Sequence, residues 1–441
     1  MANVPVETAD AIARQRRAFA TTAGSTARRA CTAPGPRYQR CIIPPAPTTA
    51  ATPPPATPRL ESVDLLRGLI MVVMALDHTR DYFHSGALLG INPLDLTQVT
   101  PWVFLTRWIT HYCAPTFSFL AGTGIFLAAQ RGQSRGALSR FLVARGLWLI
   151  LFELVVGYWI ISFSLGLHFN LALVLWQLGW SMIVLAALIH LPLWATAAFG
   201  LALIVGHNAF DAVKPQSWGA FAWLWKTLHV TAPIQVTPSF TLFIAYPLIP
   251  WLGVMAAGYS FGALYRLEAA ERKKWLLRLG LGLTVAFVLL RYANFYGDPR
   301  PWSVQPRPGF TFLSYLNVSK TPPSLCFLLM TLGPGIFLLG LLDGRTPSLL
   351  KPFLVFGRVP FFYFAAHMLL AHSLGALTNF VLCGRWDLGT IGAESPPPNA
   401  GVSLAATYAA WLLVVALMYP ACRWFSELKR RRRDLTWLSY L

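Results

Sequence analysis

The chain has 441 residues, of which 55% are hydrophobic and only 12% are charged, and its mean hydropathy is +0.52. Soluble domains carry about 25% charged residues, so this composition excludes an ordinary soluble enzyme and predicts a polytopic membrane protein. The formal charge of +19 does not indicate a nucleic-acid partner, because Lys and Arg fall in short clusters between long apolar segments.

The N-terminal segment 1–58 is rich in Pro, Ala, Thr and Arg. Such a segment cannot bury a core, so we expect a disordered cytoplasmic tail. A transmembrane domain is expected over 59–428, followed by a basic cytoplasmic C-terminus over 429–441. The six cysteines follow no disulfide or zinc-site spacing.

The transmembrane domain is predicted to be an all-α bundle of about ten helices, because apolar stretches long enough to cross about 30 Å of hydrocarbon recur along it. An even number of spans places both termini on one side. The short junction IHLPL between the fourth and fifth spans is the weakest point of this count. The predicted spans are 63–83, 102–129, 140–163, 170–190, 191–210, 239–264, 275–293, 321–342, 353–374 and 402–424.

The distribution of cations indicates which side the termini occupy. Alternate connections carry Arg131 and Arg135, then a basic cluster at 272–274, then Arg358, and the chain ends in a basic run at 429–433. Positive charge favours the cytoplasmic side. We therefore expect an integral membrane protein with both termini in the cytoplasm.

The first span combines charge with apolarity. Arg67 and His78 are eleven residues apart, which is three helical turns and about 16 Å. With Asp64 they form one stripe, and a charged side chain at bilayer depth costs roughly 2.5–3.5 kcal/mol. We therefore expect this stripe to face the bundle interior, with Arg67 and His78 lining one passage.

The end of this span, ALDHTRDYFH over 75–84, concentrates the residues best suited to proton transfer. Neutral imidazole accepts a proton near physiological pH, and a neighbouring carboxylate orients it. The catalytic candidates are Asp77, His78, Asp81, His84 and His111, with His367 and His372 expected on the same side of the membrane. Alternatively, each lone histidine is a packing residue, and the DHTRD cluster is a salt-bridge knot that ends the helix.

A metal site from His78, Asp81 and His111 has suitable ligand types but no spacing signature. We therefore predict no metal. No serine nucleophile elbow or phosphate-binding loop is present either.

Several segments together resemble a known family. RLESVDLLRG over 59–68, with an Arg-x10-His pattern from Arg67 to His78, resembles the membrane acyltransferase superfamily. The further resemblance is to the branch named for the heparan-alpha-glucosaminide N-acetyltransferase catalytic domain, and it extends from Arg59 to the C-terminal basic cluster. The segments that carry it are DHTRDYF, HYCAPTFSFLAG, YPLIPWLGVMAAGYSFG, YGDPRPW, LNVSKTPPSLCFLLMTLGPG and FGRVPFFYFAAHMLLAH.

The resemblance implies a multi-helix enzyme that takes an acetyl group from acetyl-CoA and gives it to a sugar amine or hydroxyl of an extracytoplasmic glycan. It assigns Arg67 and His78 to acyl-CoA use and transfer. The essential histidine of the lysosomal relative lies in the loop after the first helix, where His84 is the nearest counterpart, so the choice between His78 and His84 stays open.

The remaining binding candidates follow from charge and position. Inner-side charges suit the phosphates of CoA, or act only as topology signals. Outer aromatic residues suit sugar stacking, or act only as interfacial anchors. The donor candidates are Arg67, Asp64, Arg131, Arg135 and Arg358; the acceptor candidates are Arg80, Asp298, Trp302, Lys320 and His372.

Two other classes of function compete with the enzyme. In a proton-coupled secondary transporter, intramembrane Asp, Arg and His form a relay, but the two halves of the chain show no convincing internal symmetry. A non-catalytic membrane subunit would tolerate joint substitution of Arg67 and His78. The expected partners are an acyl-CoA donor, a glycan or amino-sugar acceptor and the lipid bilayer, and a homodimer is compatible with the sequence.

Overall fold

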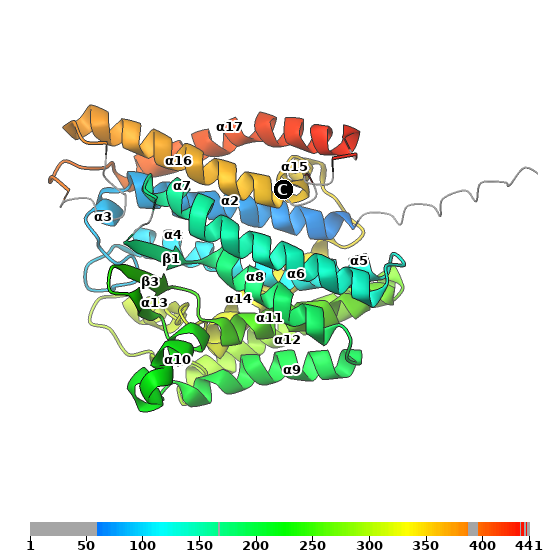
Figure 1. Cartoon of the computed structure of the whole chain (residues 1–441). Coiled ribbons are helices and arrows are strands. Elements are labelled where there is room, and N and C mark those ends of the chain that lie inside the picture. Colours follow the sequence, from blue (N-terminus) through cyan, green and yellow to red (C-terminus); the bar gives the residue numbers. More distant parts are fainter. Residues whose placement is uncertain (1–59, 166–167, 387–395, 433, 436–437, 439–441) are drawn as a thin grey trace, which may run out of the picture. The chain divides into compact units, whose positions relative to one another are not determined.

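The computed structural model describes residues 60–165, 168–386, 396–432, 434–435 and 438. The predicted tail 1–58 and part of the predicted C-terminus 429–441 lie outside these residues. The described residues belong to one compact unit, Arg59–Leu441. They form a bundle of helices, which confirms the predicted all-α polytopic fold (Figure 1).

Eight helical stretches in the described part of the chain are long and apolar enough to cross a membrane. They are Pro101–Ala129, Arg135–Ser162, Leu193–Phe210, Leu248–Arg266, Ala269–Ala293, Leu325–Leu342, Pro360–Cys383 and Leu404–Arg431. The first and fourth predicted spans correspond to two further helices, α2 (Glu61–Phe83) and α8 (Val174–Leu188). The former is rich in charge and the latter is short, which explains why neither reaches the same criterion of length and apolarity.

The bundle is built from the following longer helices. They are α4 (Pro101–Thr110), α5 (Cys113–Ala129), α6 (Arg135–Phe152), α9 (Leu193–Gly206), α11 (Leu248–Phe261), α12 (Ala269–Ala293), α14 (Leu325–Leu342), α16 (Pro360–Cys383) and α17 (Leu404–Arg431). Short elements connect them: α3 (Ser85–Leu88), a π-helical turn Glu153–Gly157, α7 (Tyr158–Ser162), α10 (Ala222–Leu228), α13 (Phe310–Leu316) and α15 (Phe353–Arg358).

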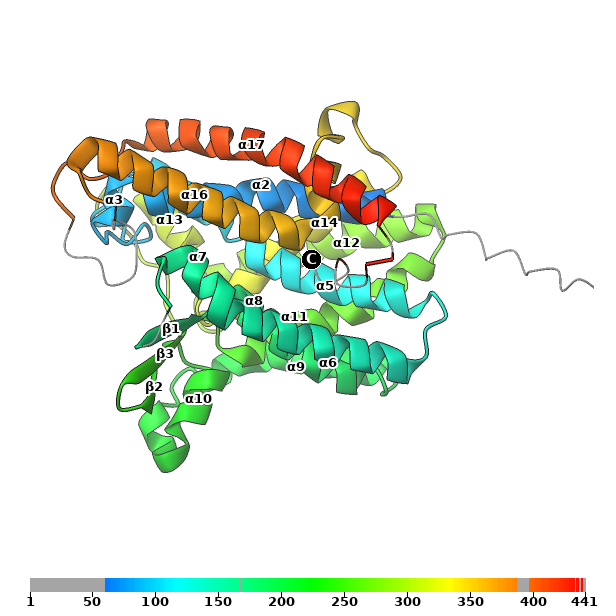
Figure 2. The same ribbon diagram turned by 45° about the horizontal axis from the view of Figure 1, so that its top comes forward.

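The helix α2 lies at the centre of the packing. It contacts α15, α16 and α17 on one side and α4, α5 and α14 on the other, and α16 and α17 run along it in both views (Figures 1 and 2). Because α2 is surrounded, 17 of its 23 residues are buried. Asp64, Asp77 and Arg80 therefore lie inside the bundle, as the cost of exposing charge to lipid requires.

Small residues bring the helices close enough for this packing. A Cβ atom on Gly122 of α5 would lie 2.1 Å from the carbonyl oxygen of Met255 on α11, and one on Gly258 of α11 would lie 2.1 Å from that of Phe119. Only glycine allows two backbones to approach this closely. The junction IHLPL is a true turn between α8 and α9, where Thr196 Oγ1 donates to the carbonyl of Leu188 at 3.1 Å.

The chain also forms a small sheet that the sequence does not predict. Strands β1 (Phe169–Ala172), β2 (Ala232–Thr237) and β3 (Phe240–Ile244) pair in the order β1-β3-β2, with β1 parallel and β2 antiparallel to β3. Two predicted spans, 170–190 and 239–264, thus begin in strands. The second helix starts only at Leu248, since a residue before proline, here Tyr246 before Pro247, disfavours helical geometry.

The two ends of the bundle differ. We call the end that carries β1–β3 and α3 the sheet end, and the end that carries Arg131, Arg135 and Arg358 the basic end. The helix α2 runs from the basic end to the sheet end, and α17 returns to the basic end (Figure 1). The N-terminus of α2 and the C-terminus of α17 thus lie at the same end of the bundle, as an even number of crossings requires.

Candidate active site

A network of buried charges occupies the last two turns of α2. The carboxylate of Asp77 pairs with Arg80 at 3.2 Å and accepts a hydrogen bond from Arg107 of α4. Arg80 also donates to Asp81 at 2.6 Å. Asp77 and Arg80 are only 8% and 4% exposed, so each charge depends on its partners rather than on water.

Local sequence explains this geometry. Asp77 and Arg80 are three residues apart and therefore lie on one face of α2. The start of α4 is fixed by Thr100, whose hydroxyl caps Val103 N, and by Pro101 in the first helical position. Arg107 follows less than two turns later, where α4 contacts α2.

A cavity of about 650 Å³ opens beside this network at the sheet end. Its volume falls within the range of small-molecule sites. Its polar and charged lining is contributed by Asp77, His78, Arg80, Asp81, Tyr82, Asn92, Arg107, Thr110, Glu153, Tyr246, Arg300, Lys320 and Thr321. Apolar side chains of α2, α5, α7 and α16 complete its wall, among them Met74 and Cys113.

His78 is the histidine that lines this cavity. It is half-buried, and its ring lies 5.4 Å from that of His367 on α16. Asp77 and Asp81 both interact electrostatically with it. An imidazole that lines a cavity and has carboxylates nearby is a candidate general base.

The other predicted histidines lie outside the cavity lining. His84 caps α2 beside a short backbone pairing with Val402. His111 is fully buried against Phe327. His372 is sandwiched between the rings of Tyr82 and Phe163, at 4.4 and 3.7 Å, and its Nδ1 lies 2.7 Å from the carbonyl of Ile160.

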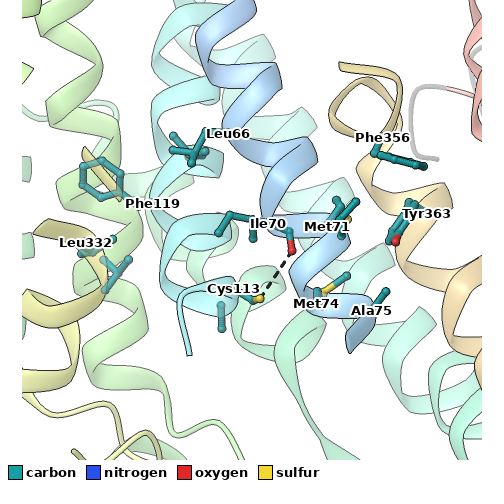
Figure 3. Close-up of a cluster of buried hydrophobic side chains, with 14 of the residues drawn as sticks. Leu66, Ile70, Met71, Met74, Ala75, Cys113, Phe119, Leu332, Phe356 and Tyr363 are labelled. Carbon is teal, nitrogen blue, oxygen red and sulfur yellow. Dashed lines mark hydrogen bonds between the residues drawn. The ribbon is translucent and has the colours of Figure 1, made fainter. Parts of the chain in front are cut away.

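The structure does not place Arg67 and His78 in one passage. Arg67 pairs with Asp64 at 3.7 Å and donates to the carbonyl of Leu120 on α5 at 2.7 Å, and neither lines the cavity. Apolar side chains fill the space between the two ends of α2 (Figure 3). This apolar layer consists of Leu66, Ile70, Met71, Met74, Ala75, Cys113, Phe119, Leu332, Phe356 and Tyr363.

Of the predicted acceptor residues, Arg80 and Lys320 line the cavity. Asp298 instead organises the loop that carries Lys320, because it accepts hydrogen bonds from Ser319 N at 2.8 Å and from the Ser324 hydroxyl at 2.7 Å. Trp302 packs near Tyr315, with ring centroids 6.0 Å apart. Neither Asp298 nor Trp302 lines the cavity.

The predicted donor residues Arg131, Arg135 and Arg358 are exposed at the basic end. Arg135 donates to the carbonyl of His190 at 3.2 Å. None of the three lines the cavity.

Three charged cavity residues were not singled out from the sequence: Arg107, Glu153 and Arg300. Glu153 is 2% exposed and accepts hydrogen bonds from Leu175 N and Trp176 N, at 2.6 and 3.3 Å, in the first turn of α8. A carboxylate is stabilised at a helix N-terminus. The sequence did offer a signal for two of them, because a charged residue that stands alone in an apolar span indicates a functional site. Arg107 is the single Lys, Arg, Asp or Glu within 102–129, and Glu153 is the single acidic residue within 140–163.

The cations around the cavity outnumber its carboxylates. Arg80, Arg107, Arg300 and Lys320 face Asp77, Asp81 and Glu153. Burial, together with the nearby Arg107, lowers the pKa of Lys320 to about 8. The cavity is therefore suited to a ligand that carries, or develops, negative charge.

His78, Asp81 and His111 do not form a group that could share an ion. Within the described ranges, the group of metal-ligating side chains that does lie together is His207, Asp211 and His229, outside the cavity.

Bundle and cavity define the class of this protein: a multi-pass membrane protein with a charged site built between its helices. The family model described as heparan-alpha-glucosaminide N-acetyltransferase, catalytic, matches residues 59–289. The match covers more than half of the chain. The chain therefore belongs to this family of membrane acetyltransferase-like proteins. The chain has no detectable match among curated proteins.

The matched region supplies most of the site. It contributes Asp77, His78, Arg107 and Glu153, whereas Lys320 and the α16 part of the wall follow it in the sequence. The family match therefore includes the charged residues of α2 and α4.

Proposed function

We propose that this protein transfers the acetyl group of acetyl-CoA to an amine or hydroxyl of a glycan or amino sugar, and that the cavity at the sheet end is the site of transfer. The observation that carries the proposal is the position of His78, which lines a cavity of about 650 Å³ together with Asp77 and Asp81. The family relation supports the acetyl transfer.

In the proposed reaction, His78 accepts the proton of the attacking amine or hydroxyl. The acceptor nitrogen or oxygen forms a bond to the thioester carbonyl carbon, and negative charge develops on the carbonyl oxygen. The C–S bond then breaks, and the leaving CoA thiolate takes the proton from the His78 imidazolium. A thioester is already activated, so binding both substrates in register supplies much of the rate enhancement.

Arg107 and Lys320 are the proposed electrostatic partners of the carbonyl oxygen. Both line the cavity beside His78, and preorganised cations in a site that excludes water stabilise developing negative charge strongly. Asp77 is already bound by two arginines, so Asp81, whose side chain is 46% exposed, is the more available carboxylate for orienting His78.

The proposed topology gives the two substrates opposite entrances. Cation-rich connections favour a cytoplasmic basic end, where Arg131, Arg135 and Arg358 are exposed for the phosphates of CoA. The acceptor then enters from the extracytoplasmic side, where the cavity rim carries the exposed residues Asn92 and Arg300.

This arrangement requires the acyl arm of the donor to cross the apolar layer. Met71 and Met74 form part of that layer on α2, and methionine side chains are flexible enough to repack around a ligand. In this proposal Arg67 is a positioning residue, because its bond to the Leu120 carbonyl holds α2 against α5 beside the path of the arm.

The first test compares three histidine variants in membranes supplied with labelled acetyl-CoA and a panel of amino sugars. His78→Ala is expected to lower transfer by about 100- to 10,000-fold, which is the usual contribution of a general base. His190→Ala, at an exposed position of the basic end, is the control for expression and is expected to keep parental activity. Full activity of His78→Ala together with loss in His84→Ala would assign the base to His84 and refute this site.

A second test addresses the path of the donor. Met74→Trp places a bulky ring at the floor of the cavity and is expected to reduce acetyl transfer while CoA binding at the basic end persists. Leu147→Trp is the matched control, because Leu147 is 55% exposed on the outer surface of α6. Equal activity of both variants would exclude a path beside Met74.

A further inference from the structure

Three side chains at the sheet end form a cluster that the proposed transfer reaction does not use. His207 lies in the 3₁₀ turn His207–Phe210 that follows α9, Asp211 comes directly after this turn, and His229 caps α10. One potential ligand atom from each lies within 4.8 Å of the others. None of the three lines the cavity.

His207 is the least satisfied member of this cluster. It is 2% exposed, and neither of its ring nitrogens has a partner in hydrogen-bond geometry, although the carbonyl of Pro323 is close to the ring. Buried polar groups nearly always have a partner. The ring of His229 faces it with centroids 5.6 Å apart.

His229 lies close to both other members of the cluster. The Nε2 atom of His229 lies 3.7 Å from Asp211 Oδ1 and 2.9 Å from the carbonyl oxygen of His207. The ring stacks on Trp225 with centroids 4.9 Å apart and planes 9° from parallel.

The second layer of contacts around the cluster is also ordered. Asn208 Nδ2 donates to Asp211 Oδ2 at 2.8 Å, which leaves Oδ1 directed toward His229. Trp225 Nε1 donates to the carbonyl of Val213 at 2.9 Å. In metal sites, hydrogen-bond partners of this kind orient the residues that bind the ion.

We propose that His207, Asp211 and His229 bind a divalent ion of the zinc class, in a site distinct from the transfer cavity. Two imidazoles and one carboxylate are a common ligand set for Zn²⁺, with a fourth position open to water. Ligand atoms about 2.0–2.1 Å from a tetrahedral ion lie about 3.3 Å from one another, so the cluster needs only small side-chain adjustments to close around it.

The ion would act as a clip at the sheet end. It would join α9 to α10, and Asn208 extends this connection to α14 because its Oδ1 accepts the Leu325 N–H at 2.9 Å. The segment before Leu325 carries Lys320, which lines the transfer cavity. The proposed role is therefore structural support of one cavity wall, and it does not depend on the identity of the reaction.

The test uses the purified full-length chain in detergent, stripped with a chelator and then titrated with ZnCl₂ alone. We expect one equivalent of zinc per chain by elemental mass spectrometry, and a Co²⁺-loaded sample with the visible absorption of a four-coordinate site. Zinc should also raise the unfolding temperature of the stripped protein.

Variants then locate the ion. Asp211→Asn and His229→Gln are each expected to weaken zinc binding by more than about 100-fold, the upper limit for changes to outer-shell partners. The matched controls Asp95→Asn and His190→Gln replace residues of the same types outside the cluster and should bind as the parent does. Failure of the parent to retain zinc would overturn the proposal, whether or not the variants fold. Unchanged zinc binding in both cluster variants would also overturn it.

Discussion

The helix α2 carries the same pair of residues twice, with different outcomes. Asp64 and Arg67 lie near its start, and Asp77 and Arg80 lie near its end, each pair three residues apart. The first pair is closed off by a bond from Arg67 to the α5 backbone and by the apolar layer. The second pair is joined by Arg107 and opens onto the cavity.

The difference shows that spacing within a helix creates an ion pair, whereas the neighbouring helices decide its use. A pair that is fully satisfied by packing fixes two helices together. A pair that shares its carboxylate with a second cation beside a cavity creates an electrostatic potential in that cavity, which can attract a charged substrate. The sequences DLLR and DHTR do not determine these outcomes by themselves. The side chains that α5 and α4 place beside them do.

The largest expected effect comes from removing the shared carboxylate. Asp77→Asn removes the carboxylate shared by the buried Arg80, which keeps Asp81 at 2.6 Å, and the partly buried Arg107. Removing one partner of a buried pair costs up to about 3–5 kcal/mol. We expect a clear loss of unfolding temperature in detergent. Asp64→Asn is the comparison, and a smaller loss is expected because Arg67 keeps the Leu120 carbonyl. Equal losses would remove the distinction between the two ends of α2.

A smaller effect is expected at Gly68, where α2 crosses α15. A Cβ atom there would lie 1.9 Å from the carbonyl oxygen of Phe353, so Gly68→Ala must push two backbones apart, at a cost of about 1–3 kcal/mol. Gly282→Ala on α12 has no atom within 4 Å of the new methyl group and serves as control. Unchanged thermal stability of Gly68→Ala would contradict close packing in this half of α2.

A third effect depends on pH and concerns the cavity end of α2. In the folded chain Lys320 loses its proton near pH 8, whereas its ordinary pKa is 10.5. Both states hold the proton below about pH 8; between the two values the unfolded chain binds more protons, so the free energy of unfolding rises with pH. Lys320→Met should abolish this contribution.

The measurement is the unfolding temperature of parent and variant across pH 7 to about 10. The difference between them should change with pH as Lys320 releases its proton. Lys351→Met, at an exposed position of the basic end, should follow the parent at every pH. A constant difference between the parent and Lys320→Met would show that Lys320 titrates normally.

Much of the architecture could be predicted from the sequence because membrane spans are written in continuous apolar runs. The runs indicated the helices, and the charges of 75–84 indicated the polar end of α2. The sheet was missed because its strands adjoin apolar helices, and a short apolar run does not distinguish the two.

The site was harder to predict because its members come from distant segments. Arg107, Glu153 and Lys320 meet His78 only after α4, the π-helical turn and the 317–324 loop have packed on α2. The isolation of Arg107 and Glu153 within apolar runs was visible, but the convergence of the three residues was not. The joint passage of Arg67 and His78 failed for a related reason: helical spacing gives a shared face, and the side chains of α5 and α14 fill the space along it.

The most direct test of the central claim is chemical rescue at His78. His78→Gly removes the proposed base but leaves room for a small molecule beside the cavity. We expect this variant to be inactive in transfer from labelled acetyl-CoA and to regain activity with added imidazole, in proportion to the neutral form. A folded His78→Gly protein that imidazole does not restore, or equal restoration of His84→Gly, would contradict proton transfer by His78 in this cavity.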